Sequence, residues 1–291
     1  MAYRYSNLTA ALGDKRSPLR EFLDRRFPHV RALQTDFRAR SGELRVPGGS
    51  ADPGQVGAAL DLAIRFLLDP QDRAEISWIG FANHARELEQ IVGVVKAAQR
   101  AAVNGDAAAL GRACWALALT TEIYRVGLRR GSALDGLLRA DRFRTNELLG
   151  LAGADAIEQL VALQGLAERE LLPRLRPPYR LGPTFAGSEL CAADADLIAG
   201  GVLIDIKTRL GVRDPKTGVR SDRLSLADVY QLLGYLFFDR DDAYRITDLA
   251  IYSARYGALI GWPVVEALQT LAGEPVDLPE VRAEVWSLLT H

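Results

Sequence analysis

The segment from Asp194 to Lys207 limits the possible folds of this chain most, because it has the pattern of a β-hairpin. It reads DADLIAGGVLIDIK, with β-prone runs on either side of Gly200 and Gly201. A two-residue hairpin turn requires positive φ angles, which glycine adopts without a steric penalty. If these glycines are the two central turn residues, the numbers of cross-strand partners add up to 401. The sequence therefore predicts an antiparallel strand pair in this register.

The predicted register gathers charged side chains on one face of the hairpin. Asp196 then lies opposite Asp205, and Asp194 lies opposite Lys207. Side chains two residues apart in a strand share a face, so all four lie together. The other face is uniformly apolar, and we expect it to be the buried one. It consists of Ala195, Leu197, Val202, Ile204 and Ile206.

Three carboxylates on one hairpin face need compensation, because like charges directly opposed across two strands destabilise the pair. Lys207 offsets part of this repulsion. A divalent cation would offset the rest, since the hard oxygen ligands of aspartate suit Mg²⁺ or Mn²⁺. The alternative is an exposed charged face with a structural ion pair.

The same residues fit a hydrolytic site. Asp196 and Asp205 would hold the metal, together with the backbone carbonyl of Ile206. A bound metal polarises a phosphodiester and lowers the pKa of a water ligand, which supplies a hydroxide near neutral pH. Lys207 lies one strand step along on the same face, where it would orient that water or stabilise the developing negative charge.

The remainder of the chain divides into a helical half and a mixed half. Apolar residues recur at helical spacing before Pro178, and short β-prone runs surround one clear helix after it. The expected helices are 55–69, 86–103, 106–128, 132–148, 153–175 and 225–239, and the expected strands are 185–191, 194–199, 202–209 and 248–257. This order predicts an α/β fold with a mixed sheet flanked by helices in residues 151–291, preceded by an α-helical region in residues 1–150.

Two motifs in this order resemble those of a known nuclease superfamily. Asp196 followed by Asp205-Ile-Lys207 resembles the acidic residue and D-x-K motif of the PD-(D/E)XK nucleases. Gln231-Leu-Leu-Gly-Tyr235 resembles the Q-x-x-x-Y motif of their RecB-like branch. Residues four apart share a helix face, so Gln231 and Tyr235 can both point toward the hairpin. The resemblance covers about residues 160–260 and implies a restriction-endonuclease-like fold, with this pair supporting the active site and contacting DNA.

The resemblance is incomplete in its metal ligands. RecB-like enzymes often place a histidine on a helix before the sheet, and His84 is the candidate here, without diagnostic context. In the wider superfamily a glutamate on the first core helix takes that position, which points to Glu168 or Glu170. Asp194 is either a second acidic ligand or a partner of Lys207, with ion pairing the default interpretation.

The loop after Lys207 is rich in basic residues and flanks the expected site. Arg209, Arg213 and Lys216 could contact nucleic-acid phosphates there, because such contacts dominate the affinity of nucleic-acid binding. A solvated loop is the alternative. No GxxxxGK[ST] motif occurs, so we expect a protein partner to supply any ATPase activity or targeting.

These features together predict a metal-dependent nuclease that hydrolyses DNA, in repair, recombination or defence against foreign DNA. Residues 1–150 would serve as a substrate-selecting, docking or cap region. We expect a cytoplasmic protein without a membrane span, since the two cysteines suit a reducing compartment and no apolar run approaches about 20 residues. The alternatives are a catalytically inactive nuclease-fold scaffold or interaction protein, and an RNA-directed nuclease.

Overall fold

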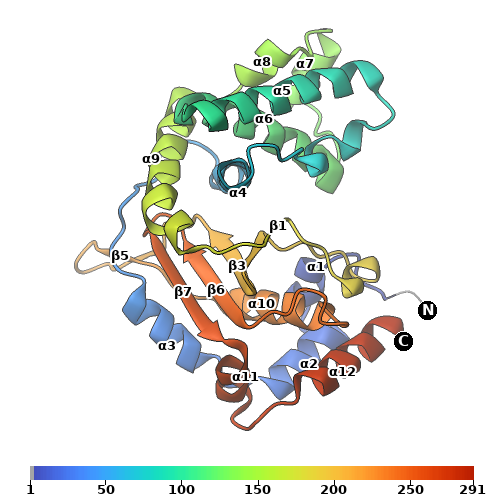
Figure 1. Cartoon of the computed structure of the whole chain (residues 1–291), viewed down its shortest axis with the longest axis vertical. Coiled ribbons are helices and arrows are strands. Elements are labelled where there is room, and N and C mark those ends of the chain that lie inside the picture. Colours follow the sequence, from blue (N-terminus) through green and yellow to red (C-terminus); the bar gives the residue numbers. More distant parts are fainter. Residues whose placement is uncertain (1–2) are drawn as a thin grey trace. The chain divides into compact units, whose positions relative to one another are not determined.

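The structure is a computed structural model that describes residues 3–291, without the side chains of residues 124–126. The chain forms two compact units (Figure 1). Unit one contains Met1–Leu44 and Arg174–His291, and unit two contains Arg45–Pro173. The expected mixed α/β class is confirmed. The division of the chain differs from the one expected at residue 150, because residues 1–44 fold with the sheet and residues 151–173 fold with the helical unit.

Unit two is helical, as the apolar spacing predicts. Its longest helices are separated by Gly105, which has a positive φ of 67°, and by Asp106, whose carboxylate accepts the Ala109 N–H at the helix start. Helix α6 packs against α4, α5 and α9. The helices of this unit are α4 (Pro53–Leu68), η1 (Glu75–Ser77), η2 (Ile79–Phe81), α5 (Ala85–Asn104), α6 (Ala107–Val126), α7 (Ala133–Arg139), α8 (Thr145–Leu149) and α9 (Ala154–Glu170). The short η3 (Leu172–Arg174) follows.

Unit one is built on a five-stranded sheet with the order β1-β2-β3-β6-β7. Strands β3 and β6 are parallel, and the other neighbours are antiparallel. The strands are β1 (Tyr179–Leu181), β2 (Leu197–Ala199), β3 (Val202–Lys207), β6 (Asp248–Ser253) and β7 (Ala258–Pro263). A separate hairpin is formed by β4 (Val212–Arg213) and β5 (Arg220–Ser221). The sheet is therefore mixed, as expected.

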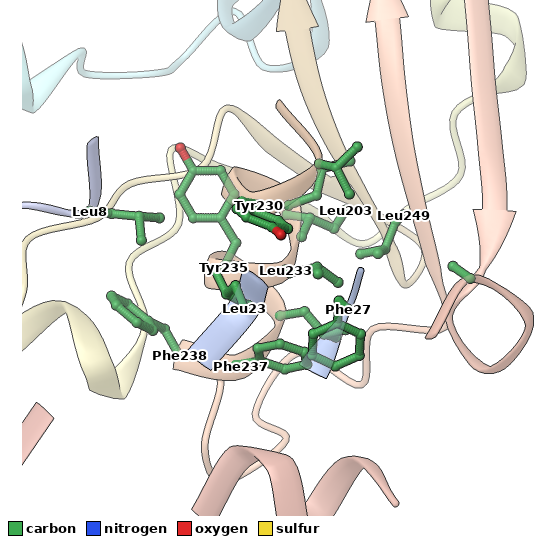
Figure 2. Close-up of a cluster of buried hydrophobic side chains, with 14 of the residues drawn as sticks. Leu8, Leu23, Phe27, Leu203, Tyr230, Leu233, Tyr235, Phe237, Phe238 and Leu249 are labelled. Atoms are coloured by element: carbon green, nitrogen blue, oxygen red, sulfur yellow. The ribbon is translucent and has the colours of Figure 1, made fainter. Parts of the chain in front are cut away.

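Helix α10 (Leu226–Phe238) lies in the core of unit one and explains why the N-terminal residues belong to this unit. Phe27 stacks on Phe237 of α10 with 5.5 Å between ring centroids. Figure 2 shows side chains from the N-terminal segment, the sheet and α10 packed together. The remaining helices are α1 (Leu8–Gly13), α2 (Pro18–Arg26), α3 (Arg31–Arg40), η4 (Ala186–Glu189), α11 (Val264–Ala272) and α12 (Leu278–Thr290).

The glycine hairpin has the predicted register. Leu197 pairs with Ile204, and Ala199 pairs with Val202. Gly200 and Gly201 have positive φ angles of 57° and 88°, which are the values that a two-residue turn of this class requires. The register prediction is confirmed from Leu197 onward.

The burial of the hairpin differs from the expectation. Leu197 and Ile204 on the apolar face are buried, but the opposite face is buried as well. Leu203 alternates with Asp205 and belongs to the core around α10, so the aspartate is only 2% exposed. A strand with a parallel neighbour inside a sheet is commonly buried on both faces. On the charged face Asp205 is therefore buried beneath α10, whereas Asp194, Asp196 and Lys207 keep part of their surface exposed.

The strand predictions need correction at several points. The expected strand 185–191 is the short helix η4, where the Phe185 N–H donates to Ser188 Oγ and Ser188 Oγ donates to the Ala193 carbonyl. This local exchange of side-chain and backbone hydrogen bonds competes with strand pairing. The expected strand 248–257 ends at Ser253, and strands β1 and β7 were not expected. In the described part of the chain, no helix is long and apolar enough to cross a membrane.

Candidate active site

Lys207, the last residue of β3, is surrounded by acceptors. Its Nζ lies 2.7 Å from Asp205 Oδ2 and 3.8 Å from Asp228 Oδ1. It also donates a hydrogen bond of 3.0 Å to Gln231 Oε1. Burial lowers the pKa of Lys207, but the neighbouring carboxylates, Asp205 first among them, outweigh burial and leave that pKa raised. The ammonium therefore stays charged at neutral pH, held between the sheet and α10.

Helix α10 carries the two motif residues, Gln231 and Tyr235, next to the Lys207 ammonium. Gln231 Nε2 donates a 2.7 Å hydrogen bond to Tyr235 Oη, so both side chains lie on one helix face, as their spacing predicts. Burial raises the pKa of Tyr235 far above its usual value, and the charges of Asp205, Asp196 and Asp194 add to this. The phenol is thus a neutral group close to all three hairpin carboxylates.

The helix begins where it does because of a capping box. Ser225 Oγ accepts the Asp228 N–H, and Asp228 Oδ2 accepts the Ser225 N–H. The expected helix 225–239 matches α10 to within one residue at each end. The cap fixes the position of the Asp228 carboxylate beside Lys207. Asp228 was not predicted as a site residue, and its contact with Lys207 was not expected.

The hairpin carboxylates have different surroundings. Asp196 Oδ2 accepts the Ile206 N–H at 2.6 Å, which holds this side chain against β3. Asp194 forms an isolated antiparallel bridge with Thr184, so its backbone pairs away from the hairpin. Asp205 is the most buried of the three, and burial raises its pKa while the charge of Lys207 lowers it. Its Oδ2 is buried and lies 2.7 Å from the Lys207 ammonium, which is its charged partner.

Arg209 has a different environment from the one expected for a residue that binds nucleic acid. Its Nε donates to Asp222 Oδ1 and its Nη1 donates to Asp228 Oδ2, both at 2.6 Å. Asp222 is fully buried, and a buried carboxylate requires a charged or hydrogen-bonding partner. The guanidinium is therefore engaged inside the protein. Asp222 and Ser253, whose Oγ donates to Asp222 Oδ2 at 2.5 Å, were not predicted as site residues.

Arg213 and Lys216 are exposed, as expected for this loop. They belong to the hairpin of β4 and β5, whose turn is closed by Asp214. The Asp214 carboxylate accepts the N–H groups of Lys216 and Thr217. Both basic side chains are accordingly available on the surface of unit one.

The other candidate metal ligands lie in the helical unit. Glu168 is an exposed residue of α9, and Glu170 pairs with Arg45 at 2.6 Å. His84 is exposed at the start of α5. These three residues belong to unit two, whereas the hairpin and α10 belong to unit one.

The residues present fit a magnesium or manganese ion held by few protein ligands. Among the described residues, no three His, Cys, Asp or Glu side chains form a metal-binding group. Mg²⁺ commonly binds through one or two carboxylates, with water and substrate phosphate completing its shell. Asp205 offers a buried carboxylate that is paired with Lys207, and Asp196 offers a second carboxylate, held against β3 by the Ile206 N–H. The Ile206 carbonyl is the further oxygen expected from the sequence.

Comparisons of the chain with protein-family models, curated proteins and solved structures find no match.

Proposed function

We propose that this chain is a metal-dependent nuclease of the PD-(D/E)XK type, with its active site in unit one. The observation that carries the proposal is the position of the Lys207 ammonium, in contact with both Asp205 of the hairpin and Gln231 of α10. The D-x-K and Q-x-x-x-Y motifs thus meet at one cation, although 24 residues separate Lys207 from Gln231. Two unrelated motifs would not be expected to contact the same ammonium group.

The protein side chains have distinct tasks in this proposal. Asp196 and Asp205 would hold Mg²⁺ or Mn²⁺, with the Ile206 carbonyl. The bound metal would polarise the phosphodiester and lower the pKa of its water. Lys207 holds a positive charge where negative charge develops on the phosphate. Gln231 fixes the ammonium by accepting a hydrogen bond from it, and Tyr235 fixes Gln231 by accepting a hydrogen bond from the amide N–H.

DNA is the proposed substrate, in repair, recombination or defence, and the exposed Arg213 and Lys216 would contact its phosphates. One observation favours a second candidate, a catalytically inactive scaffold. Lys207 already neutralises Asp205 without a metal, as a purely structural ion pair would. A substrate test separates the two candidates.

Purified protein incubated with linear duplex DNA, circular DNA, single-stranded DNA and RNA provides that test. Each substrate is combined with Mg²⁺, Mn²⁺ or EDTA. We expect cleavage of a DNA substrate in Mg²⁺ or Mn²⁺ and none in EDTA. Cleavage of RNA alone would instead establish the RNA-directed alternative. Absence of cleavage, together with absence of Mn²⁺ binding by calorimetry, would favour the scaffold.

A further inference from the structure

A series of polar contacts joins Lys207 of β3 to Ser253 of the neighbouring strand β6. The pairing of these two strands closes the series into a ring. Asp228 lies between Lys207 and Arg209, through separate carboxylate oxygens. Arg209 then reaches Asp222, and Asp222 Oδ2 accepts the hydroxyl of Ser253. Ser253 is the register partner of Lys207 in the parallel pair of β3 and β6. The ring therefore starts and ends on adjacent strand positions.

The links from Asp228 through Arg209 and Asp222 to Ser253 are short, and the groups that Arg209 joins are buried, although the Arg209 side chain itself is 29% exposed. The contacts of Arg209 with Asp222 and Asp228 are both 2.6 Å, and the hydroxyl contact of Ser253 is 2.5 Å. Asp222 and Ser253 have no exposed surface, and Asp228 is 7% exposed. Charge-assisted hydrogen bonds are stronger than neutral ones, and exclusion of water strengthens them further. The guanidinium is consequently fixed in position from both sides.

Arg209 reduces the attraction between the Asp228 carboxylate and the Lys207 ammonium. The guanidinium and the Ser225 N–H both occupy Asp228 Oδ2, so only Oδ1 faces the ammonium, at the longer distance of 3.8 Å. Asp205 and Gln231 hold the same ammonium at 2.7 and 3.0 Å. Without Arg209, the full charge of Asp228 would attract Lys207 away from these two partners, because the attraction between unit charges grows as their distance falls.

We propose that Arg209 is a positioning residue, which sets the location of the Lys207 ammonium through Asp228 and is itself anchored by Asp222 and Ser253. The inference rests on the proposed nuclease function and adds a residue to its machinery. It also assigns this arginine a role distinct from the phosphate contact expected of the basic loop. Arg31, which is exposed on α3 of the same unit, provides a matched control outside the proposed site.

The test measures kcat and KM for the wild type and for Arg209→Met, Arg209→Lys, Ser253→Ala and Arg31→Met. Misplacement of a reacting group by about 1 Å can cost about 100-fold in rate. We expect Arg209→Met to lower kcat by about 10- to 100-fold with KM within about twofold. Arg209→Lys should recover part of the loss, because lysine keeps the charge but cannot pair with two carboxylates in the fork geometry of arginine. Ser253→Ala should lower kcat by less than Arg209→Met, and Arg31→Met should leave kcat unchanged.

A double variant separates positioning from general structural support. If Arg209 acts through Lys207, Arg209→Met should not reduce further the residual rate of Lys207→Ala. Wild-type kcat in Arg209→Met would overturn the inference while leaving the nuclease function intact. Equal losses in Arg209→Met and Arg209→Lys, with a lowered melting temperature in both, would also overturn it. If Arg209→Met does not fold, the kcat values of Arg209→Lys and Ser253→Ala decide the result. A wild type that cleaves no substrate would refute the proposed function itself.

Discussion

Replacing Lys207 with alanine is expected to lower the rate of phosphodiester cleavage by about 100- to 1,000-fold, the usual cost of losing one preorganised group that stabilises transition-state charge. The ammonium is the group that contacts both motifs, through Asp205 and Gln231. We expect the fold to persist, because the Asp205 carboxyl can take up a proton when its partner is removed. Single-turnover cleavage gives the rate, and circular dichroism gives the folded fraction.

Lys216→Ala is the matched control for this experiment. Lys216 is exposed on the turn of the β4–β5 hairpin, where its backbone N–H, and not its charge, closes the turn. The same substitution there should leave the cleavage rate at saturating substrate unchanged. A Lys207→Ala protein that cleaves as fast as the wild type, or a Lys216→Ala protein that loses as much, would remove Lys207 from the mechanism.

Replacing Arg282 with alanine is expected to destabilise unit one by about 3 kcal/mol, the usual cost of removing one partner from a buried ion pair. Arg282 of α12 is 4% exposed and lies 3.6 Å from the buried carboxylate of Asp239. It also donates to the Leu236 carbonyl at the end of α10 and to Asp242. Its loss would leave the C-terminal end of α10 and Asp239 without this charge. Urea denaturation measures the change in the free energy of unfolding.

Arg240→Ala provides the comparison for Arg282. Arg240 is exposed and stacks over the Trp286 ring at 4.3 Å. A cation–π contact at an exposed site contributes about 0.5–1 kcal/mol. The Arg282 variant should therefore lose several times more stability than the Arg240 variant. Losses of equal size would show that the buried network does not hold α12 to α10.

The central hairpin could be predicted because residues within the hairpin determine its turn and its register. Gly200 and Gly201 fix the turn, and the turn fixes the register through Leu197 and Ile204. The start of α10 was equally local, since Ser225 and Asp228 form their capping box within one helical turn. Where neighbouring residues alone determine the conformation, the pattern in the sequence is sufficient.

Features that depend on distant residues were not predicted. The N-terminal helices join unit one because Phe27 packs on Phe237, a contact that no local pattern reports. The burial of Asp205 follows from α10 covering its face, whereas the alternation in the hairpin favoured the opposite face as the buried one. A charged residue on a buried face is uncommon, so sequence patterning assigns it to solvent.

The same limit applies to the site. Gln231 and Tyr235 share a helix face as their spacing predicts, and Gln231 contacts Lys207 as the resemblance to the nuclease motifs implies. Arg209 was assigned to the surface because its loop is rich in charge. Its two carboxylate partners are 13 and 19 residues away, and no short-range pattern distinguishes such partners from other acidic residues.

Metal-dependent cleavage by the wild type and by Asp205→Asn tests the account most directly. The asparagine keeps the size of the buried side chain but removes the charge that faces Lys207 and the proposed cation. In Mg²⁺ the wild type should cleave its DNA substrate, and EDTA should abolish that cleavage. The cleavage by Asp205→Asn should equal the residual cleavage by the wild type in EDTA, whether Mg²⁺ or EDTA is added. Equal cleavage by the two proteins in Mg²⁺, or undiminished wild-type cleavage in EDTA, would contradict a metal-dependent nuclease site at this hairpin.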